Sequence, residues 1–174
     1  MKKILTAMLI NAILLIATLT CANAQNIIAG LSNEEFTTTF DNNESREKIN
    51  KDEVNVKAIK NFEKSFKHVD NVNWYKAPGG FMVYFFQDGT KKVSSYNHAG
   101  NWIYDLVSYP EEKLSKDLWN RVKGVYYSFS ITWINEVKTG NKIIYVVHLE
   151  DKSSYKNIRV CDGEMDEIEE MKKN

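Results

Sequence analysis

The sequence predicts an α+β domain in which two units, each a helix followed by three or four strands, form one antiparallel sheet with both helices packed on one face. Three observations predict this fold. An amphipathic helical pattern occurs twice, at about 54–67 and at about 110–124. Short strand patterns separated by turn residues follow each helix. The strands of the two halves also align with each other, which indicates an internal repeat.

The first 24 residues are typical of a secretory signal peptide. Lys2 and Lys3 precede an apolar run, and residues 22–24 (Ala-Asn-Ala) form a small-residue cleavage site. We therefore expect cleavage after Ala24, a mature chain of 174 − 24 = 150 residues, and a periplasmic or secreted location. No later segment has the ~20 apolar residues that a membrane helix needs, so no membrane span is expected after signal removal. Lipid attachment at Cys21 is the alternative.

Charge and cysteine content exclude some classes of partner and of stabilisation. Without the two signal lysines, 23 − 2 = 21 basic residues face 23 acidic ones, a net charge of −2. A chain without a basic excess is not expected to bind nucleic acid. Cys161 is alone in the mature chain, so the fold must rely on its apolar core rather than on an internal disulfide. We expect Cys161 to be a small apolar strand residue; a reactive thiol or an intermolecular bridge is the alternative.

Residues 25–53 are polar and show no sustained apolar period, so we expect a flexible leader. The alternative is a strand-like arm around residues 36–40 that docks on the core or on a partner. The domain itself is expected at 54–170.

The first predicted unit covers residues 54–108. Its helix has Val56, Ile59, Phe62 and Phe66 on one face. Strand patterns follow at 72–76, 81–87, 91–97 and 102–107. Asp88-Gly89 lies between two of them and is a strong signal for a two-residue hairpin turn.

The second predicted unit covers residues 109–168. Pro110 suits the first turn of a helix, and Gly124 suits its end. Strand patterns follow at about 128–138, 142–150 and 153–161, and we expect residues 166–173 to be a solvated or frayed tail. When the two units are aligned, Tyr84 falls on Tyr145 and Gly100 falls on Gly163.

Over residues 54–168 the chain resembles the PepSY-like, beta-lactamase-inhibitor-like domains exported by Bacteroidetes. The resemblance is carried by the first helix, the strand tryptophan Trp74, the strand at 81–85, the segment 99–103, and the second pass from Pro110 to residues 162–164. It implies a helix-backed antiparallel sheet with an open face, an envelope location, and a binding or inhibitory role. This sequence departs from the family pattern at Tyr109, where leucine is common, and at 98–99, where an acidic residue often precedes the glycine.

No pattern predicts a metal, a cofactor or a catalytic centre. His68, His98 and His148 are 30 and 50 residues apart and belong to no ligand motif. No serine lies in a Gly-x-Ser-x-Gly elbow, and Gly79-Gly80 lacks the strand-to-helix context of a phosphate loop. His148 alternates with apolar neighbours, so we expect it to face solvent or a sheet edge. We expect a protein that is not an enzyme.

The high aromatic content favours a binding surface. The mature chain has 4 Trp, 9 Tyr and 8 Phe, and both faces of the strands at 81–86 and 143–147 are apolar. Helices cover only one face, so the other is covered by the leader, a dimer partner or a ligand, unless the aromatics only fill the core.

Our leading hypothesis is that the uncovered face binds an envelope protein or a peptide. The candidate residues are Tyr84, Tyr96, Trp102, Tyr104, Tyr145 and Tyr155, with Asp88 at a hairpin tip that is comparable to the inserting tip of the inhibitor that the family resembles. The alternative is a small apolar or lipid-like ligand held in a pocket between the sheet and the helices.

Overall fold

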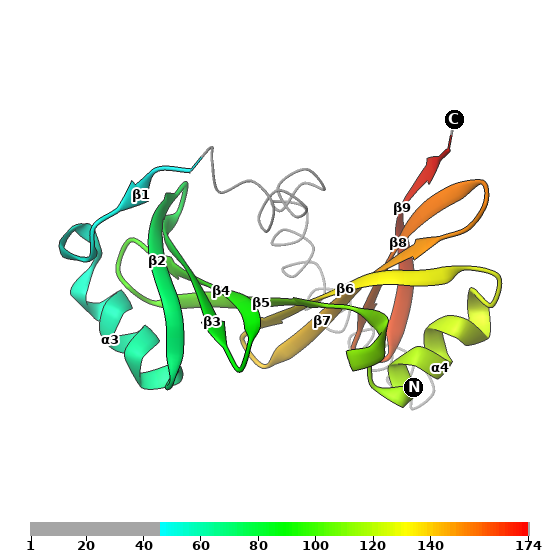
Figure 1. Ribbon diagram of the computed structural model, residues 1–174, viewed down its shortest axis with the longest axis horizontal. Coiled ribbons are helices and arrows are strands. Elements are labelled where there is room, and N and C mark those ends of the chain that lie inside the picture. The colour runs from blue at the N-terminus through cyan, green and yellow to red at the C-terminus, as the bar shows by residue number, and fades with distance from the viewer. Residues whose placement is uncertain (1–45, 174) are drawn as a thin grey trace, which may run out of the picture. The chain divides into compact units, whose positions relative to one another are not determined.

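A nine-stranded antiparallel sheet runs through residues 46–173, the part of the chain that the computed structural model describes (Figure 1). The strands follow one another in chain order from β1 to β9, so each pairs with its predecessor and its successor. The predicted signal peptide and most of the predicted leader lie outside the described residues.

After β1, the same order of elements occurs twice in the described chain: a 3-10 turn, a ten-residue helix and four strands. The helices are α3 (Val56–Ser65) and α4 (Lys116–Val125), preceded by η2 (Lys51–Glu53) and η3 (Glu111–Lys113). The strands are β1 (Lys48–Ile49), β2 (Val69–Ala77), β3 (Gly80–Gln87), β4 (Thr90–Asn97), β5 (Trp102–Tyr109), β6 (Ser130–Thr139), β7 (Lys142–Glu150), β8 (Ser154–Cys161) and β9 (Glu164–Lys172). That the two halves superpose stays a prediction.

Each helix begins at a side-chain cap and buries one stripe against the sheet. The Asn55 side chain accepts a hydrogen bond from the Lys57 amide, and the Ser115 hydroxyl accepts one from the Leu118 amide. These contacts satisfy amide groups that have no partner within the helix. The buried stripes are Ala58 and Phe62 in α3, and Leu118 and Val122 in α4.

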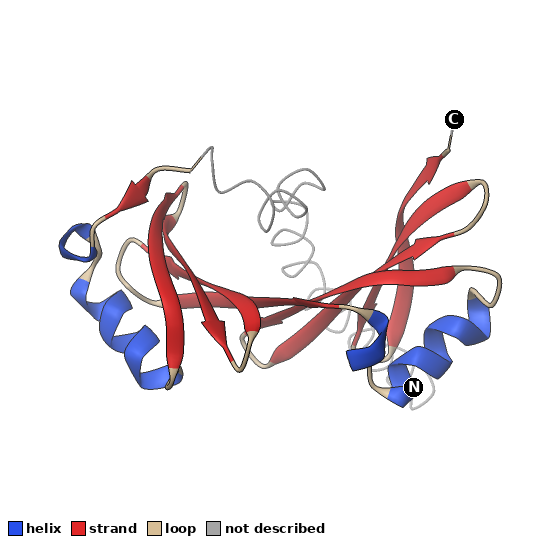
Figure 2. Cartoon of the chain, viewed as in Figure 1, coloured by secondary structure: helices blue, strands red, loops and turns tan. Residues whose placement is uncertain are grey.

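Two apolar clusters join these stripes to the sheet. The first contains Phe62 with Trp74, Val83 and Phe85. The second contains Leu118 and Val122 with Ile134, Val147, Ile158 and Val160. Register pairs connect the two clusters across six strands, in the order Phe85, Lys92, Val107, Glu136, Tyr145, Val160. Because paired residues point to the same face, α3 and α4 pack on one face of the sheet, as predicted (Figure 2).

Two segments differ from the sequence-based expectation. The leader was expected to continue to residue 53, but β1 pairs with β2 and Ile49 is buried in the α3 cluster. The turn that follows is closed by the Asn50 amide, which donates to Glu53 Oε1 at 2.9 Å. The segment is too short to show a period, although its two apolar residues, Ile49 and Val54, both reach the core.

The predicted frayed tail is also wrong, because residues 164–172 form strand β9 beside β8. Its acidic side chains meet basic ones on β8: Arg159 Nη2 lies 2.5 Å from Asp166, and Lys156 Nζ lies 2.9 Å from Glu167. Charged side chains are common on edge strands, where they oppose pairing with other chains. The strongly charged sequence of this segment is therefore that of an edge strand and not of a frayed tail.

The hairpin predicted at Asp88-Gly89 is present between β3 and β4. Both residues have positive φ, 53° and 70°, and Gln87 pairs with Thr90 on either side of them. Positive φ at both central residues is the backbone conformation that a two-residue type I′ hairpin turn requires.

Candidate functional site

The sheet face opposite α3 and α4 carries no helix within residues 46–173, and we call it the helix-free face. One line of register pairs crosses it from β3 to β8, and we call this line the central row. Its members are Tyr84, Val93, Leu106, Val137, Ile144 and Cys161. All six are at most 4% exposed.

Burial of the central row corrects the expectation of an open face. Along β5, Leu106 is buried on the helix-free face, whereas its neighbour Val107 on the helix side is only half-buried. Along β7, Ile144 is likewise buried, and Ile143 is exposed. The middle of the sheet therefore buries its helix-free side and leaves the helix side more open. Large aromatic side chains contribute to the burial of the helix-free side: the Tyr75 and Tyr84 rings pack edge to face, with their centres 5.1 Å apart.

Exposed apolar side chains on the helix-free face lie away from the central row. Phe86 is on β3, Trp133 on β6, Tyr155 on β8 and Met171 on β9, and these four are 37–47% exposed. We call them the rim residues. Tyr155 and Met171 are register partners, and Trp133 pairs with His148. Large side chains of this kind are typical anchors of protein interfaces.

A row of polar side chains crosses the helix-free face from β5 to β9. Its members are Ser108, Asn135, His148, Asn157 and Glu169. The Ser108 hydroxyl donates to Asn135 Oδ1, the amide of Asn135 lies 2.8 Å from His148 Nε2, and the Asn157 amide donates to Glu169 at 2.6 Å. Burial lowers the pKa of His148, which favours the neutral imidazole. His148 is therefore half-buried in a central strand and does not lie at a sheet edge, one of the two placements expected for it.

Two buried polar atoms on the helix-free face have no hydrogen-bond partner among the described residues: the Tyr84 hydroxyl and Arg159 Nε. Tyr84 is 3% exposed, and its burial raises the pKa of the phenol to about 12. Arg159 is 9% exposed and bonds Asp166 through Nη2 alone. A buried polar atom without a partner is unfavourable, so each atom needs a structural or functional explanation.

The structure brings only some of the predicted residues together. Tyr84, Tyr104 and Tyr155 lie on the helix-free face, where the first two are buried and the third is exposed. Asp88 is exposed at the tip of the β3–β4 hairpin.

The other three predicted residues lie on the helix side. Tyr96 is buried in the α3 cluster, with its hydroxyl 3.1 Å from Ser94 Oγ. The Trp102 indole donates to Asp105 at 2.8 Å, and Tyr145 packs against the α4 cluster. The prediction that all six aromatic residues lie on one face is therefore wrong.

Tyr145 was assigned to the wrong face because the sequence alignment of the two halves is shifted by one residue relative to the strand register. The hairpins close at Ala77–Gly80 and at Thr139–Lys142, so the position that corresponds to Tyr84 is Val146. Because successive strand residues alternate between faces, a slip of one residue moves a side chain to the opposite face.

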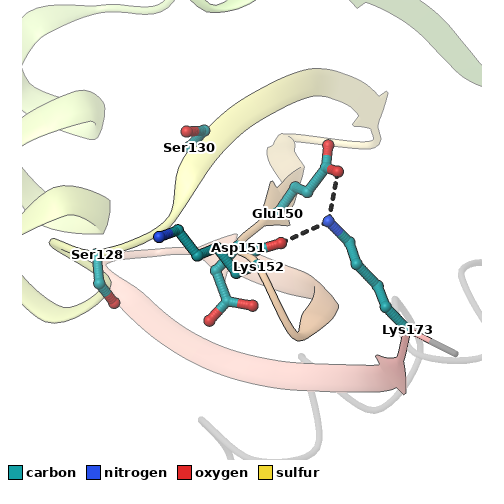
Figure 3. Close-up of a pocket in the computed structure, with 6 residues that line it drawn as sticks. All are labelled: Ser128, Ser130, Glu150, Asp151, Lys152 and Lys173. Atoms are coloured by element: carbon teal, nitrogen blue, oxygen red, sulfur yellow. Dashed lines mark hydrogen bonds and ion pairs between the residues drawn. The ribbon is translucent and has the colours of Figure 1, made fainter.

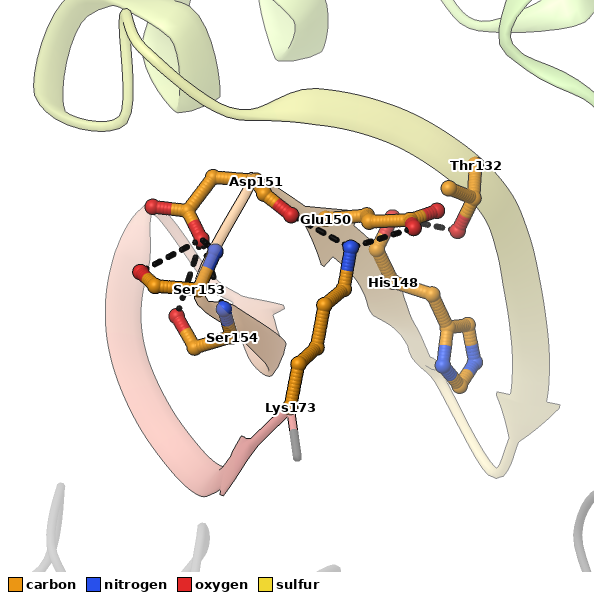
Figure 4. A network of polar contacts seen from close by, with 7 residues as sticks. All are labelled: Thr132, His148, Glu150, Asp151, Ser153, Ser154 and Lys173. Carbon is orange, nitrogen blue, oxygen red and sulfur yellow. Dashed lines mark hydrogen bonds and ion pairs between the residues drawn. The ribbon is translucent and has the colours of Figure 1, made fainter.

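A polar network fixes the ends of β7, β8 and β9 beside the rim residues. The Asp151 carboxylate accepts hydrogen bonds from the amides of Ser153 and Ser154, at 2.8 and 2.7 Å (Figure 4). These bonds hold the pKa of Asp151 below its ordinary value. Lys173 bonds Glu150 at 2.6 Å along a polar pocket that Ser128, Ser130 and Lys152 also line (Figure 3). Lys173 also lies 4.6 Å from the centre of the Tyr155 ring, so the network positions that rim residue.

An apolar pocket of about 450 Å³ lies between α3 and the outer edge of β2. Its apolar lining consists of Ile49, Ile59, Phe62, Val69, Val72 and Trp74. The Lys51–Glu63 ion pair, 2.8 Å long and well exposed, joins two other residues of the lining.

Within residues 46–173, no three His, Cys, Asp or Glu side chains gather as a metal site would require. None of the helices in this part of the chain is long and apolar enough to cross a membrane. Cys161 is buried in β8.

Comparison with known proteins finds likeness in structure only. No family model matches the sequence, and no curated protein matches it. A DUF2874 family protein from Bacteroides ovatus has a TM-score of 0.58 at 15% identity, over 68% of this chain and 87% of the other. A BLIP-like protein from Bacteroides fragilis has 0.58 at 12% identity, over 68% and 86%. A candidate periplasmic protein from Bacteroides eggerthii has 0.57 at 9% identity, over 68% and 88%.

These likenesses establish the fold alone. The BLIP-like neighbour agrees with the beta-lactamase-inhibitor-like part of the resemblance seen in the sequence. The PepSY-like part stays an expectation.

Proposed function

We propose that this protein is a non-enzymatic, exported module that binds another protein or a peptide on its helix-free sheet face. The observation that carries the proposal is the set of four exposed rim residues, three of them aromatic, on a face that has a buried apolar centre. Isolated large side chains above a packed base make effective anchors, because they bury much area on binding and lose little conformational freedom. The BLIP-like and candidate periplasmic neighbours support a binding module in the envelope.

The test begins with capture of a partner from an envelope extract by the mature chain, followed by affinity measurements with the purified partner. Trp133→Ala and Tyr155→Ala should each weaken binding by about 2 kcal/mol, as expected for interface anchors. Calorimetry or surface plasmon resonance measures the change.

Trp119→Ala is the matched control. Trp119 is 38% exposed, close to the 42% of Trp133, but lies on α4, on the other side of the sheet. Its loss should leave affinity unchanged. A larger effect at Trp119 than at Trp133 and Tyr155 would place the interface on the helices and contradict the proposal.

Asp88→Asn separates face binding from insertion of the hairpin tip. The exchange keeps the turn, because asparagine also accepts positive φ, and removes the charge. Face binding predicts a nearly silent exchange. Insertion of the tip predicts a loss of about 1.5–3 kcal/mol, typical of a hydrogen bond to a charged group.

A small apolar or lipid-like ligand is the second candidate function, and the pocket between α3 and β2 favours it. Five of its lining side chains are aliphatic or aromatic residues of α3 and β2. Val72, which is 38% exposed, is the residue to change. Under this function Val72→Lys abolishes binding of a fluorescent fatty acid by the mature chain, and under the face-binding function no such binding occurs in the wild type.

A further inference from the structure

The two unpartnered atoms of the helix-free face lie near the ends of the central row. Tyr84 is on β3, and Arg159 is on β8, two residues from Cys161. Five inter-strand steps of about 4.8 Å separate these strands, so the two side chains are about 24 Å apart along the sheet. An extended segment of about seven residues spans that length.

The chemistry of the two atoms restricts the kind of ligand group that can bind to them. Arg159 Nε carries a hydrogen and only donates, and the Tyr84 hydroxyl donates equally well. Both groups can therefore donate a hydrogen bond to an oxygen atom. The Arg159 charge is already balanced by Asp166, 2.5 Å from Nη2, so a neutral carbonyl oxygen suits Nε better than a second carboxylate.

Two long side chains lie beside Tyr84 on the helix-free face. The Lys91 amino group lies 5.7 Å from the centre of the Tyr84 ring, and the Arg46 guanidinium bonds Met82 Sδ two positions along the same face of β3. Both long side chains are half-buried and have many rotamers. A ligand that approaches Tyr84 on this face therefore displaces one or both of them.

Resting on the proposed function, we propose that the ligand of the helix-free face is an extended polypeptide segment of at least seven residues that crosses strands β3 to β8. Its main-chain carbonyl oxygens accept hydrogen bonds from the Tyr84 hydroxyl and from Arg159 Nε, and its apolar side chains pack against the exposed rim residues. Such a segment crosses the strands and does not add to an edge of the sheet.

The probe is a random twelve-residue peptide library displayed on phage and selected on the mature chain; one enriched peptide is then synthesised. Tyr84→Phe removes only the hydroxyl and should weaken binding of this peptide about fivefold. The free variant should unfold at the same or a higher denaturant concentration, because an unsatisfied buried hydroxyl has been removed. Weaker binding without loss of stability is a signature that a purely structural residue does not give.

Arg159→Lys keeps the charge beside Asp166 and removes Nε, and it should weaken binding about tenfold. Tyr96→Phe is the matched control: its hydroxyl already meets Ser94 on the helix side, so affinity should not change. The two six-residue halves of the peptide should bind far more weakly than the whole.

Three outcomes overturn the inference. First, if Tyr84→Phe and Arg159→Lys both bind with the affinity of the wild type, the two proposed contacts do not exist. If Trp133→Ala still weakens binding in that case, the helix-free face remains the binding face, but the ligand is not the proposed crossing segment. Enriched peptides that all require one Asp or Glu point to a carboxylate and not to main-chain oxygens. A library that yields no peptide excludes an extended segment as the ligand, whatever protein the face binds.

Discussion

Phe62→Ala should lower the free energy of unfolding by about 3–5 kcal/mol, the range for a buried phenylalanine replaced by alanine. Phe62 is 4% exposed and attaches α3 to the sheet, with its ring 5.0 Å from that of Phe85 and 5.7 Å from that of Trp74. Both ring pairs are edge to face, an arrangement that adds to the energy of burial. Urea unfolding followed by far-ultraviolet circular dichroism measures the loss.

The control for Phe62 is Phe86→Ala. Phe86 follows Phe85 in β3 but points to the helix-free face and is 37% exposed. Its loss should cost about 1 kcal/mol or less, as for other surface positions. Equal losses at Phe62 and Phe86 would contradict the assignment of α3 to the Phe85 side of the sheet.

Leu106→Ala should cost about 2–5 kcal/mol, although no described helix lies over Leu106. The side chain is fully buried in the central row between Val93 and Val137, which are themselves fully buried. Deleting its methyl groups leaves a cavity that neighbours fixed in a sheet cannot fill. Thermal and urea unfolding of the mature chain measure the effect.

Val107→Ala is the control for Leu106, since it changes the next residue of the same strand on the helix side, where the side chain is only half-buried. The expected loss is about 1 kcal/mol. A larger loss at Val107 than at Leu106 would mean that the helix side, and not the helix-free side, packs the middle of the sheet.

The sequence predicts the fold well where local signals are strong. The spacing of Phe62 and its neighbours predicts α3, and Asp88-Gly89 predicts the hairpin at the residues where it occurs. It predicts less at β9, where charges that pair with β8 resemble those of a solvated tail. The local sequence pattern of a segment does not show which strand will pair with it in the sheet.

The candidate site is harder to predict because it depends on register between strands. Tyr84 and Tyr145 align in sequence, yet the hairpin closures place them on opposite faces. Trp133 was missed because β6 shifts register between Ile131 and Trp133, which breaks simple alternation at that point. The polar row was missed because its five members come from five strands and meet only in the sheet.

The most direct test of a binding function on the helix-free face is methyl NMR of the mature chain titrated with its purified partner. Neighbouring residues on β6 and β7 provide the comparison, because Val137, Ile144 and Val146 point to the helix-free face whereas Ile134 and Val147 point to α4. Binding on the helix-free face predicts that the methyl signals of the first three shift and that those of the other two do not. Shifts confined to Ile134 and Val147 would contradict it.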